Sequence, residues 1–215
     1  MTDDSRFPDP ARCPGDGPLA WGADLEPETL VDAYRHGIFP WPDPSGELWW
    51  WSPDPRAIIP LDKLRVTRSL RRSVVRYRCT RDRAFAEVVA GCADRPGEGT
   101  WIIPALARSY VLLHRAGVTH SVEVWREADG RDELVGGVFG AALGGAFLGE
   151  SMFSRARDAS KVALVHLVEH LRQRGFSLLD AQVPSAHLAS LGAVSVPRSR
   201  FLAALDEACG QAARF

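Results

Sequence analysis

The sequence predicts an α+β protein in which a small N-terminal domain, residues 1–60, precedes a larger domain, residues 61–215, built on a mixed sheet flanked by helices. Three observations lead to this prediction. Proline and tryptophan are concentrated before Pro60, and regular periodicity begins after it. Strand-like alternation with glycine-containing turns occupies residues 121–153. Helical and strand patterns then alternate to the end of the chain.

The first sixty residues predict one short helix, Glu26 to His36, which starts near Pro27 and is stopped by Gly37. FPWP at residues 39–42 and WWW at residues 49–51 follow it. So many prolines and rings predict an irregular segment held by aromatic packing rather than by backbone hydrogen-bond ladders.

Three helices are expected after the boundary. Thr67 caps a helix through Tyr77, and a second helix covers residues 84–92. A third follows Pro104 and turns an apolar stripe inward, namely Leu106, Tyr110 and Leu113.

Strand periodicity then begins at Ser121, and turns at Asp129-Gly130 and at residues 143–145 divide it into a three-stranded antiparallel meander ending near Phe153. Asp158 or Ser160 caps the clearest helix of the chain, which Gly175 ends and whose buried stripe is Leu164, Leu167, Val168 and Leu171.

A strand at residues 176–183, a short helical turn, a last strand from Gly192 and a helix opened by Pro197 complete the chain. This order of elements looks like the fold of the acetyl-CoA-dependent N-acetyltransferases. Fold alone does not give function.

Charge is distributed unevenly. Residues 63–83 contain nine cations and one anion, whereas the formal net charge of the chain is -1. Four arginines gather on one side of the predicted helix after Thr67, opposite its apolar stripe; they are Arg68, Arg71, Arg72 and Arg76. A one-sided basic face on an otherwise acidic protein predicts a phosphate-binding site.

The remaining composition predicts a cytoplasmic protein without a metal. The four cysteines contain no CxxC pair, which favours reduced thiols over a zinc site or a disulfide framework. The N terminus lacks the cations and apolar run of a secretory signal, and the uncharged stretch after Leu134 is too short and glycine-rich to span a membrane. His166 and His170 are spaced for one helix face, but no third ligand has suitable spacing.

Several uncommon strings stand in order along the chain: GIFPW at 37–41, WWSPDPR at 50–56, GTWI at 99–102, HSVEVW at 120–125, GESMFSR at 149–155, DASK at 158–161, DAQV at 180–183 and HLASLG at 187–192. Together they resemble the leucyl/phenylalanyl-tRNA–protein transferases over residues 17–205. Ala23 stands where a glycine is expected, Ala181 where a cysteine is usual, and the tryptophan run has one ring more than expected. None of these departures affects a position to which we assign chemistry.

The resemblance implies an aminoacyltransferase that moves Leu or Phe, with Met as a further donor, from tRNA to the α-amine of proteins with N-terminal Arg or Lys. This marks those proteins for degradation under the N-end rule, and it needs no cofactor. Conversion of an ester to an amide is downhill, so the main task is to align the amine with the ester carbonyl. The α-amine, whose reference pKa is about 8, must lose a proton before it attacks.

The resemblance also assigns the reacting centre to Asp180, Gln182 and Glu150. Asp180 and Gln182 lie two apart on a predicted strand and so share a face. Because a glutamine amide is a poor proton acceptor, we expect Gln182 to position the amine while Asp180 orients the amide. Glu150 is expected to hold either the α-ammonium or the basic side chain of the acceptor.

Further positions are assigned by the same resemblance. Trp41, Trp101 and Phe147 match positions that hold the aminoacyl-adenosine end, where adenine would stack. On a flat strand Phe147 and Glu150 would face opposite ways, so a bulge at Gly149 is expected. The residues that match the amino-acid pocket are Val138, Met152 and Leu179.

Two other functions are alternatives. An acetyl-CoA-dependent N-acetyltransferase needs a glycine-rich loop at a helix N terminus to hold pyrophosphate, but residues 154–159 contain no glycine and place an acid at the cap. A non-catalytic tRNA-binding module would explain the arginine face but would give Asp180, Gln182 and Glu150 no role.

Overall fold

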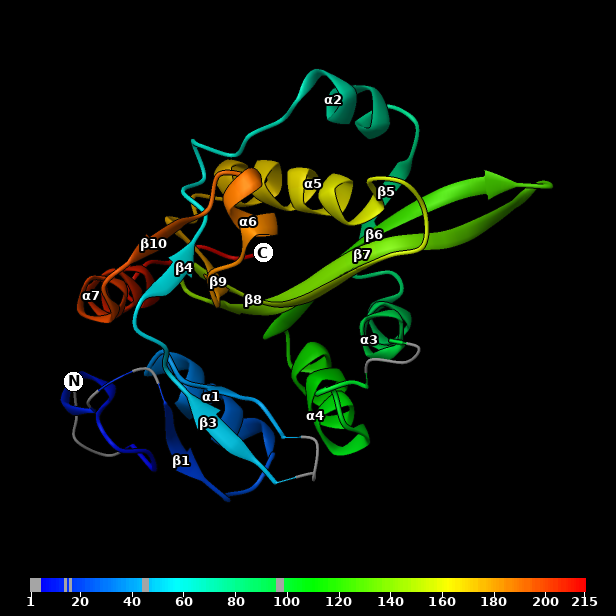
Figure 1. The fold of residues 1–215 in the computed structure, drawn as a ribbon. Coiled ribbons are helices and arrows are strands. Elements are labelled where there is room, and N and C mark those ends of the chain that lie inside the picture. Colours follow the sequence, from blue (N-terminus) through cyan, green and yellow to red (C-terminus); the bar gives the residue numbers. More distant parts are fainter. Residues whose placement is uncertain (1–4, 14, 16, 44–46, 96–98) are drawn as a thin grey trace.

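The computed structural model describes residues 5–13, 15, 17–43, 47–95 and 99–215 (Figure 1). The strands are β1 (Pro18–Trp21), β2 (Phe39–Pro40), β3 (Trp49–Trp51), β4 (Arg56–Ile58), β5 (Arg78–Arg81), β6 (Thr119–Ala128), β7 (Arg131–Leu143), β8 (Ala146–Ser154), β9 (Leu178–Gln182) and β10 (Val194–Val196). The helices are the 3-10 turn η1 (Pro10–Arg12), α1 (Pro27–Arg35), α2 (Arg68–Val74), α3 (Phe85–Ala93), α4 (Pro104–Arg115), α5 (Ala159–Gln173), α6 (Ala186–Ser190) and α7 (Arg198–Cys209).

The strands form two sheets. A three-stranded sheet, in the order β1-β3-β2, belongs to the N-terminal part, and a seven-stranded sheet, in the order β10-β4-β9-β8-β7-β6-β5, forms the centre of the rest. In the large sheet β8 and β9 run parallel, and the other described neighbours run antiparallel. The predicted α+β class, with a small N-terminal part and a mixed sheet flanked by helices, is confirmed.

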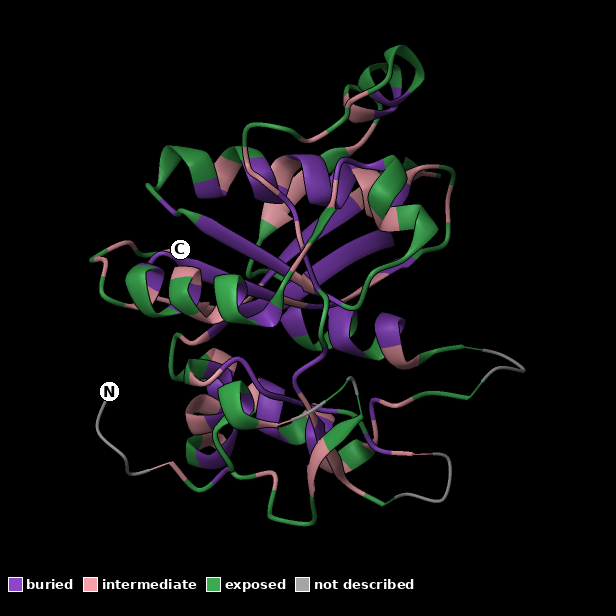
Figure 2. Cartoon of the chain, turned by 60° about the vertical axis from the view of Figure 1, so that its left-hand side comes forward, coloured by how far each residue is buried: buried purple, intermediate pink, exposed green. Residues whose placement is uncertain are grey.

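Helices cover both faces of the large sheet. Helix α5 packs on one face, with α2 against it, whereas α3, α4 and α7 pack on the other (Figure 1). Figure 2 shows the central strands and the inner sides of these helices buried. Each face has its own apolar core, and the core on the α3–α4 face continues into the N-terminal part through α1 and Trp50. The sheet therefore separates two cores, and the N-terminal part extends one of them.

The prediction of an N-terminal segment without backbone ladders was wrong. Trp49–Trp51 form the central strand of the small sheet. Their burial alternates: Trp50 is fully buried against Phe7, whereas its two neighbours are half-buried. Because all three residues are tryptophan, the sequence shows no alternation that would reveal this burial pattern. Pro40 is tolerated because β2 is an edge strand.

The predicted helix from Thr67 is shorter than expected. Thr67 does cap it, accepting a hydrogen bond from the N–H of Leu70 at 3.2 Å, but α2 ends at Val74 rather than Tyr77. The chain must turn there because β5 begins at Arg78 and pairs with β6 as the edge of the large sheet.

Asp158 occupies the N-cap position of α5 but does not cap it. Its backbone is left-handed, with φ of 63°, and its carboxylate instead accepts a hydrogen bond of 2.9 Å from the Ser73 hydroxyl on α2. The remaining predicted elements from α3 to α7 are present, and the turns at Asp129-Gly130 and Gly144-Gly145 join the meander β6-β7-β8.

Strand β4 was not predicted, since its three residues lie between prolines and are too few to show periodicity. It pairs with β9 and β10 in the large sheet although it precedes Pro60. The division at Pro60 stays a prediction. None of the described helices is both long and apolar enough to cross a membrane.

Candidate active site

Glu150 lies at a bulge in β8. Phe139 of β7 pairs with Ser151 and Gly140 pairs with Gly149, which leaves Glu150 without a partner in the ladder. A bulge redirects the side chain of its extra residue. The predicted irregularity next to Gly149 is therefore present, and it places a carboxylate in the interior, only 7% exposed.

The surroundings of Glu150 are unusual for a carboxylate. The buried hydroxyl of Tyr110 on α4 donates a hydrogen bond of 2.8 Å to Glu150 Oε2. Burial raises the pKa of Glu150 to about 7, and the charge of Asp180 adds to the rise, while Tyr110, Tyr34 and Gln182 oppose it. Although Tyr34 and Gln182 are close enough to act on this pKa, Oε1 has no well-formed hydrogen bond among the described residues. The same holds for the hydroxyl of Tyr34.

Asp180 on β9 is bound by a residue outside the set predicted from the sequence. Arg56 on β4 donates to both carboxylate oxygens, from Nε to Oδ1 at 2.8 Å and from Nη2 to Oδ2 at 2.6 Å. Both side chains are almost completely buried. The signal was available, since Arg56 ends the WWSPDPR string and is followed by apolar residues.

Gln182 ends β9 in a left-handed conformation, with φ of 60°. Its backbone N–H donates to Asp180 Oδ1 at 2.9 Å. The carboxylate of Asp180 therefore holds the main chain of Gln182, and the expectation that it orients the side-chain amide is corrected. The side chain of Gln182 instead lies near Glu150.

Glu150 and Gln182 border a cleft of about 430 Å³. The rings of Trp41 and Trp101 stand on its wall with centroids 6.2 Å apart. Trp41 is 41% exposed and thus available to a ligand. The lining also includes Phe39, Arg95, Glu150, Met152, Gln182 and His187. The structure thus brings together two predicted adenosine-binding rings and two predicted catalytic residues.

A smaller pocket of about 110 Å³ adjoins the cleft and shares Glu150, Ser151, Met152, Ala181 and Leu188 with it. Its walls are apolar and contain all three residues predicted for the amino-acid pocket; the apolar residues are Ile59, Val138, Met152, Leu164, Leu167, Leu179 and Leu188. Glu150 and Asp180 also line it. An apolar pocket with a carboxylate at its border can receive an apolar side chain and, beside it, an amine.

Phe147 is not placed with the other predicted residues. It is fully buried within the core on the α5 side of the sheet and contacts Phe215, with ring centroids 5.5 Å apart. It lines neither the cleft nor the apolar pocket.

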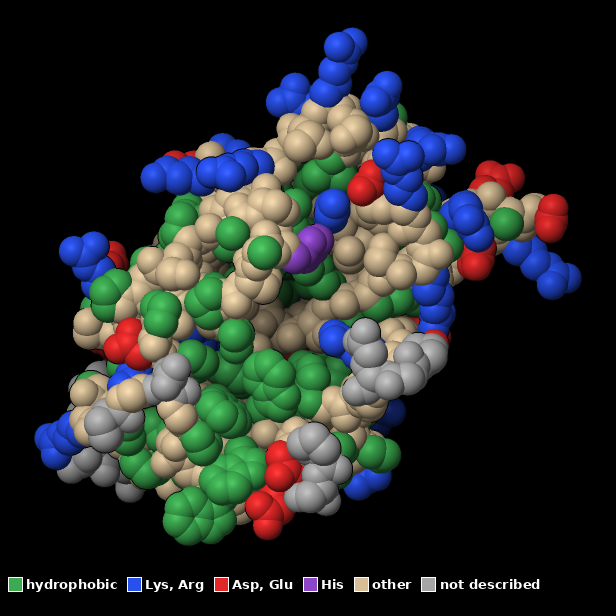
Figure 3. All heavy atoms as spheres, in the orientation of Figure 1, with side chains coloured by type: hydrophobic (Ala, Val, Ile, Leu, Met, Phe, Trp, Pro, Cys, Tyr) green, Lys and Arg blue, Asp and Glu red, His purple; other side chains and the backbone are tan. Residues whose placement is uncertain are grey.

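The four predicted arginines are all exposed, while Leu70 and Ser73 on the opposite side of α2 are buried. Figure 3 shows Lys and Arg side chains gathered over α2 and hydrophobic side chains gathered over the N-terminal part of the same face, with a hollow between them. A second groove, of about 540 Å³, runs along that N-terminal part; it is lined by proline and tryptophan rings and meets the cleft at Phe39, Trp41 and Val183.

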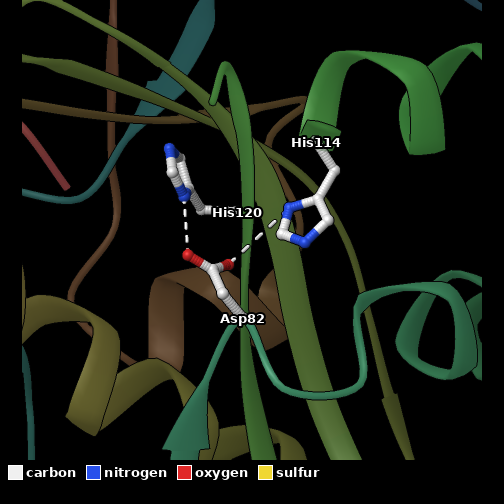
Figure 4. Close-up of side chains that lie close together, drawn as sticks. All are labelled: Asp82, His114 and His120. Atoms are coloured by element: carbon white, nitrogen blue, oxygen red, sulfur yellow. Dashed lines mark hydrogen bonds and ion pairs between the residues drawn. The ribbon is translucent and has the colours of Figure 1, made fainter. Parts of the chain in front are cut away.

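Asp82, His114 and His120 lie together away from the cleft (Figure 4). Their geometry suits hydrogen bonding rather than a metal ion. His120 Nδ1 is 2.8 Å from Asp82 Oδ2 and its Nε2 is 3.2 Å from the carbonyl of Gly117, while His114 Nδ1 is 2.8 Å from the carbonyl of Thr119. Burial raises the pKa of Asp82, but hydrogen bonds from His120 and Ser121 outweigh it and leave that pKa lowered.

Comparisons with known proteins agree along most of the chain. Residues 58–206 match the family described as "Leucyl/phenylalanyl-tRNA protein transferase", and residues 23–54 match its N-terminal domain. A leucyl/phenylalanyl-tRNA–protein transferase of Stutzerimonas stutzeri is 52% identical over 94% of this chain and 91% of its own length. One from Anaeromyxobacter dehalogenans is 52% identical over 95% and 88%. The solved structure of L-PGS from Bacillus licheniformis is 13% identical, with a TM-score of 0.41 over 76% of this chain and 54% of that one.

Proposed function

Because this chain belongs to the leucyl/phenylalanyl-tRNA–protein transferase family, we propose that it transfers a leucyl or phenylalanyl group from tRNA to the α-amine of a protein that begins with Arg or Lys. The chain is an aminoacyltransferase. We propose which donor and which acceptor it uses, and what each site residue does.

The observation that carries the proposal is the position of Glu150. One of its oxygens is held by Tyr110, and the other has no hydrogen-bond partner among the described residues, at the border between the apolar pocket and the cleft. A buried acceptor without a partner is costly, and a bound ammonium group would supply the missing donors. Glu150 therefore binds the acceptor's α-ammonium.

The apolar pocket and the cleft bind different parts of the aminoacyl-tRNA donor. The pocket of Val138, Met152 and Leu179 receives the leucyl or phenylalanyl side chain, since a charged side chain would lose its hydration among these apolar residues. Trp41 and Trp101 receive the terminal adenosine by stacking. The arginines of α2 contact tRNA phosphates through their exposed face.

The reaction needs only these groups. The amine nitrogen attacks the ester carbonyl carbon, the C–N bond forms, and the C–O bond to the ribose breaks. The bound α-ammonium loses two protons in all. Glu150, with a pKa of about 7, takes the first from an ammonium whose reference pKa is about 8, and the amine can then attack. The second proton leaves the nitrogen as the amide forms and goes to the leaving ribose oxygen, so protons balance. Gln182 positions the reacting groups from the edge of the cleft.

The direct test is incubation of the protein with radiolabelled leucyl-tRNA and a peptide beginning with Arg. We expect label in the peptide, none when its α-amine is acetylated, and none when labelled acetyl-CoA replaces the tRNA. Arginyl-tRNA serving as well as leucyl-tRNA would contradict the donor pocket. Binding of charged and uncharged tRNA without transfer would instead favour a non-catalytic tRNA-binding module.

The same proposal extends to the fold, the domains and the compartment. The meander β6-β7-β8, the crossover helix α5 and the parallel strand β9 support an acetyltransferase-like fold for residues 61–215. The separate small sheet supports a domain at residues 1–60. A reaction that consumes aminoacyl-tRNA supports a cytoplasmic protein that marks its substrates for degradation.

A further inference from the structure

Arg56 joins the two walls of the cleft. On one side its guanidinium holds both oxygens of Asp180, which in turn holds the backbone N–H of Gln182. On the other side its Nη1 donates to the carbonyl of Gly37 at 3.1 Å. Gly37 ends the turn after α1 and leads directly into the segment that carries Trp41.

The guanidinium is also fixed from its two faces. Its Cζ lies 4.8 Å from the ring centroid of Phe39 and 4.4 Å from that of Phe201, and Arg56 is only 2% exposed. Stacking and a bidentate fork use properties that arginine has and lysine lacks. The side chain therefore has one orientation, determined by four neighbours in three parts of the chain.

Stability alone is a weak explanation for this arrangement, because a buried ion pair often contributes less than an apolar replacement would. We propose that Arg56 is a positioning residue that sets the separation and orientation of the Trp41 wall and the Asp180–Gln182 turn. This inference rests on the proposed function, in which those two walls bind the reacting groups. Arg56 touches neither substrate and acts through Asp180 and Gly37.

Two variants of Arg56 test the inference. Arg56→Lys keeps the charge but cannot make the fork to Asp180 and reach Gly37 together. Arg56→Met keeps an apolar stem between the two rings and leaves the buried Asp180 carboxylate without its cationic partner. We expect kcat for leucyl transfer to fall roughly a hundredfold in Arg56→Met, the scale of losing one aligned polar group, and less in Arg56→Lys.

The chain supplies a matched control. Arg198 on α7 is another buried arginine, but its guanidinium donates to backbone carbonyls at Cys13, Gly15 and Ser52 and contacts no residue of the cleft. Arg198→Met should lower thermal stability while kcat of the folded enzyme stays as in the wild type. A purely structural role for Arg56 would give the same result as this control.

Two readouts separate positioning from stability. The loss in Arg56→Met should fall on kcat, with leucyl-tRNA affinity unchanged, whereas Arg198→Met should change neither. Amide hydrogen exchange of residues 178–183 should be faster in Arg56→Met than in Arg198→Met, because the N–H of Gln182 loses its fixed acceptor.

The exchange measurement does not depend on catalysis. If the wild-type protein failed to transfer leucine, the proposed function would be wrong, and exchange at residues 178–183 would still show whether Arg56 holds the turn. Wild-type kcat and wild-type exchange in Arg56→Met would overturn the inference. So would losses no larger than those of Arg198→Met.

Discussion

Tyr110 donates a hydrogen bond of 2.8 Å to Oε2 of Glu150, and both side chains are buried. The bond favours the charged carboxylate and burial favours the neutral acid, and the balance leaves the pKa of Glu150 at about 7. Oε1 has no hydrogen-bond partner among the described residues. Among the described residues, a well-formed hydrogen bond therefore fixes only one oxygen of this carboxylate.

The first prediction concerns the pH dependence of transfer. In the wild type, kcat/KM for an Arg-starting peptide should rise near pH 7 as Glu150 ionises and fall above about pH 8, the reference pKa of the acceptor amine, because Glu150 binds and deprotonates the ammonium form. Glu150→Gln should lose the lower rise and instead become faster as the amine loses its proton to solvent. Steady-state kinetics across this pH range would check this prediction. If the rise of kcat/KM near pH 7 were unchanged in Glu150→Gln, a group other than Glu150 would be responsible for it.

Much of the fold follows from local signals. Pro27 and Gly37 bound α1, and glycine-containing turns divide the meander, because backbone conformation at these positions depends little on the rest of the chain. The short strand β4 could not be foreseen, since three residues form a strand only when β9 and β10 are already beside them. Likewise, a run of three tryptophans does not show which ring points inward.

The site was predicted through family resemblance rather than from geometry. Val138, Met152 and Leu179 do lie together, although each alone resembles an ordinary core residue. Arg56 was missed because its partner Asp180 is far away in sequence, although its place at the end of the WWSPDPR string, before apolar residues, was a usable signal. Phe147 faces the core on the α5 side because side chains alternate along β8.

A second prediction tests the hydrogen bond from Tyr110 to Glu150. Removing the hydroxyl in Tyr110→Phe takes away a donor that favours the charged form of Glu150, so the lower rise in kcat/KM should move to higher pH. Tyr77→Phe is the matched control, because the hydroxyl of Tyr77 bonds to the carbonyl of Arg157 away from the cleft. The midpoint of the control should equal that of the wild type. A shift to lower pH in Tyr110→Phe would contradict the assignment.

A third prediction follows for the free energy of unfolding. The pKa of Glu150 is raised on folding, so the folded state retains a proton that the unfolded chain loses above its ordinary pKa. Below that pKa the group has no effect. As pH rises from there to about 7, wild-type stability falls, by roughly 3 kcal/mol at 1.36 kcal/mol per pKa unit. In urea unfolding, the free energy of unfolding of Glu150→Gln should therefore increase relative to that of the wild type between pH 5 and pH 8. A constant difference would show that Glu150 is not buried in this way.

A fourth prediction concerns tRNA binding. Arg71→Glu/Arg72→Glu should weaken binding of leucyl-tRNA strongly, and wild-type affinity should fall steeply with salt as phosphate contacts release counterions. The control is Arg35→Glu/Arg200→Glu, which makes the same charge change at exposed positions on α1 and α7. Filter binding at several salt concentrations would measure both. Equal losses of tRNA affinity in the two double variants would show that net charge, and not the position of Arg71 and Arg72, causes the effect.

The last prediction concerns the choice between leucyl and phenylalanyl donors. The apolar pocket measures about 110 Å³, whereas a cavity of about 150 Å³ is known to hold benzene. Shortening Leu179 on its wall should therefore favour the larger donor. We expect Leu179→Ala to raise the ratio of phenylalanyl to leucyl transfer by roughly tenfold, the scale of one or two methylene groups in an apolar pocket.

Leu179→Val should change the ratio in the same direction with less risk to folding. Leu112→Ala on the exposed side of α4 is the matched control and should leave the ratio unchanged. Single-turnover transfer from an equal mixture of the two charged tRNAs measures the ratio independently of the fraction of folded enzyme. If both donors slowed equally in Leu179→Ala, this pocket would not be the one that holds the donor side chain.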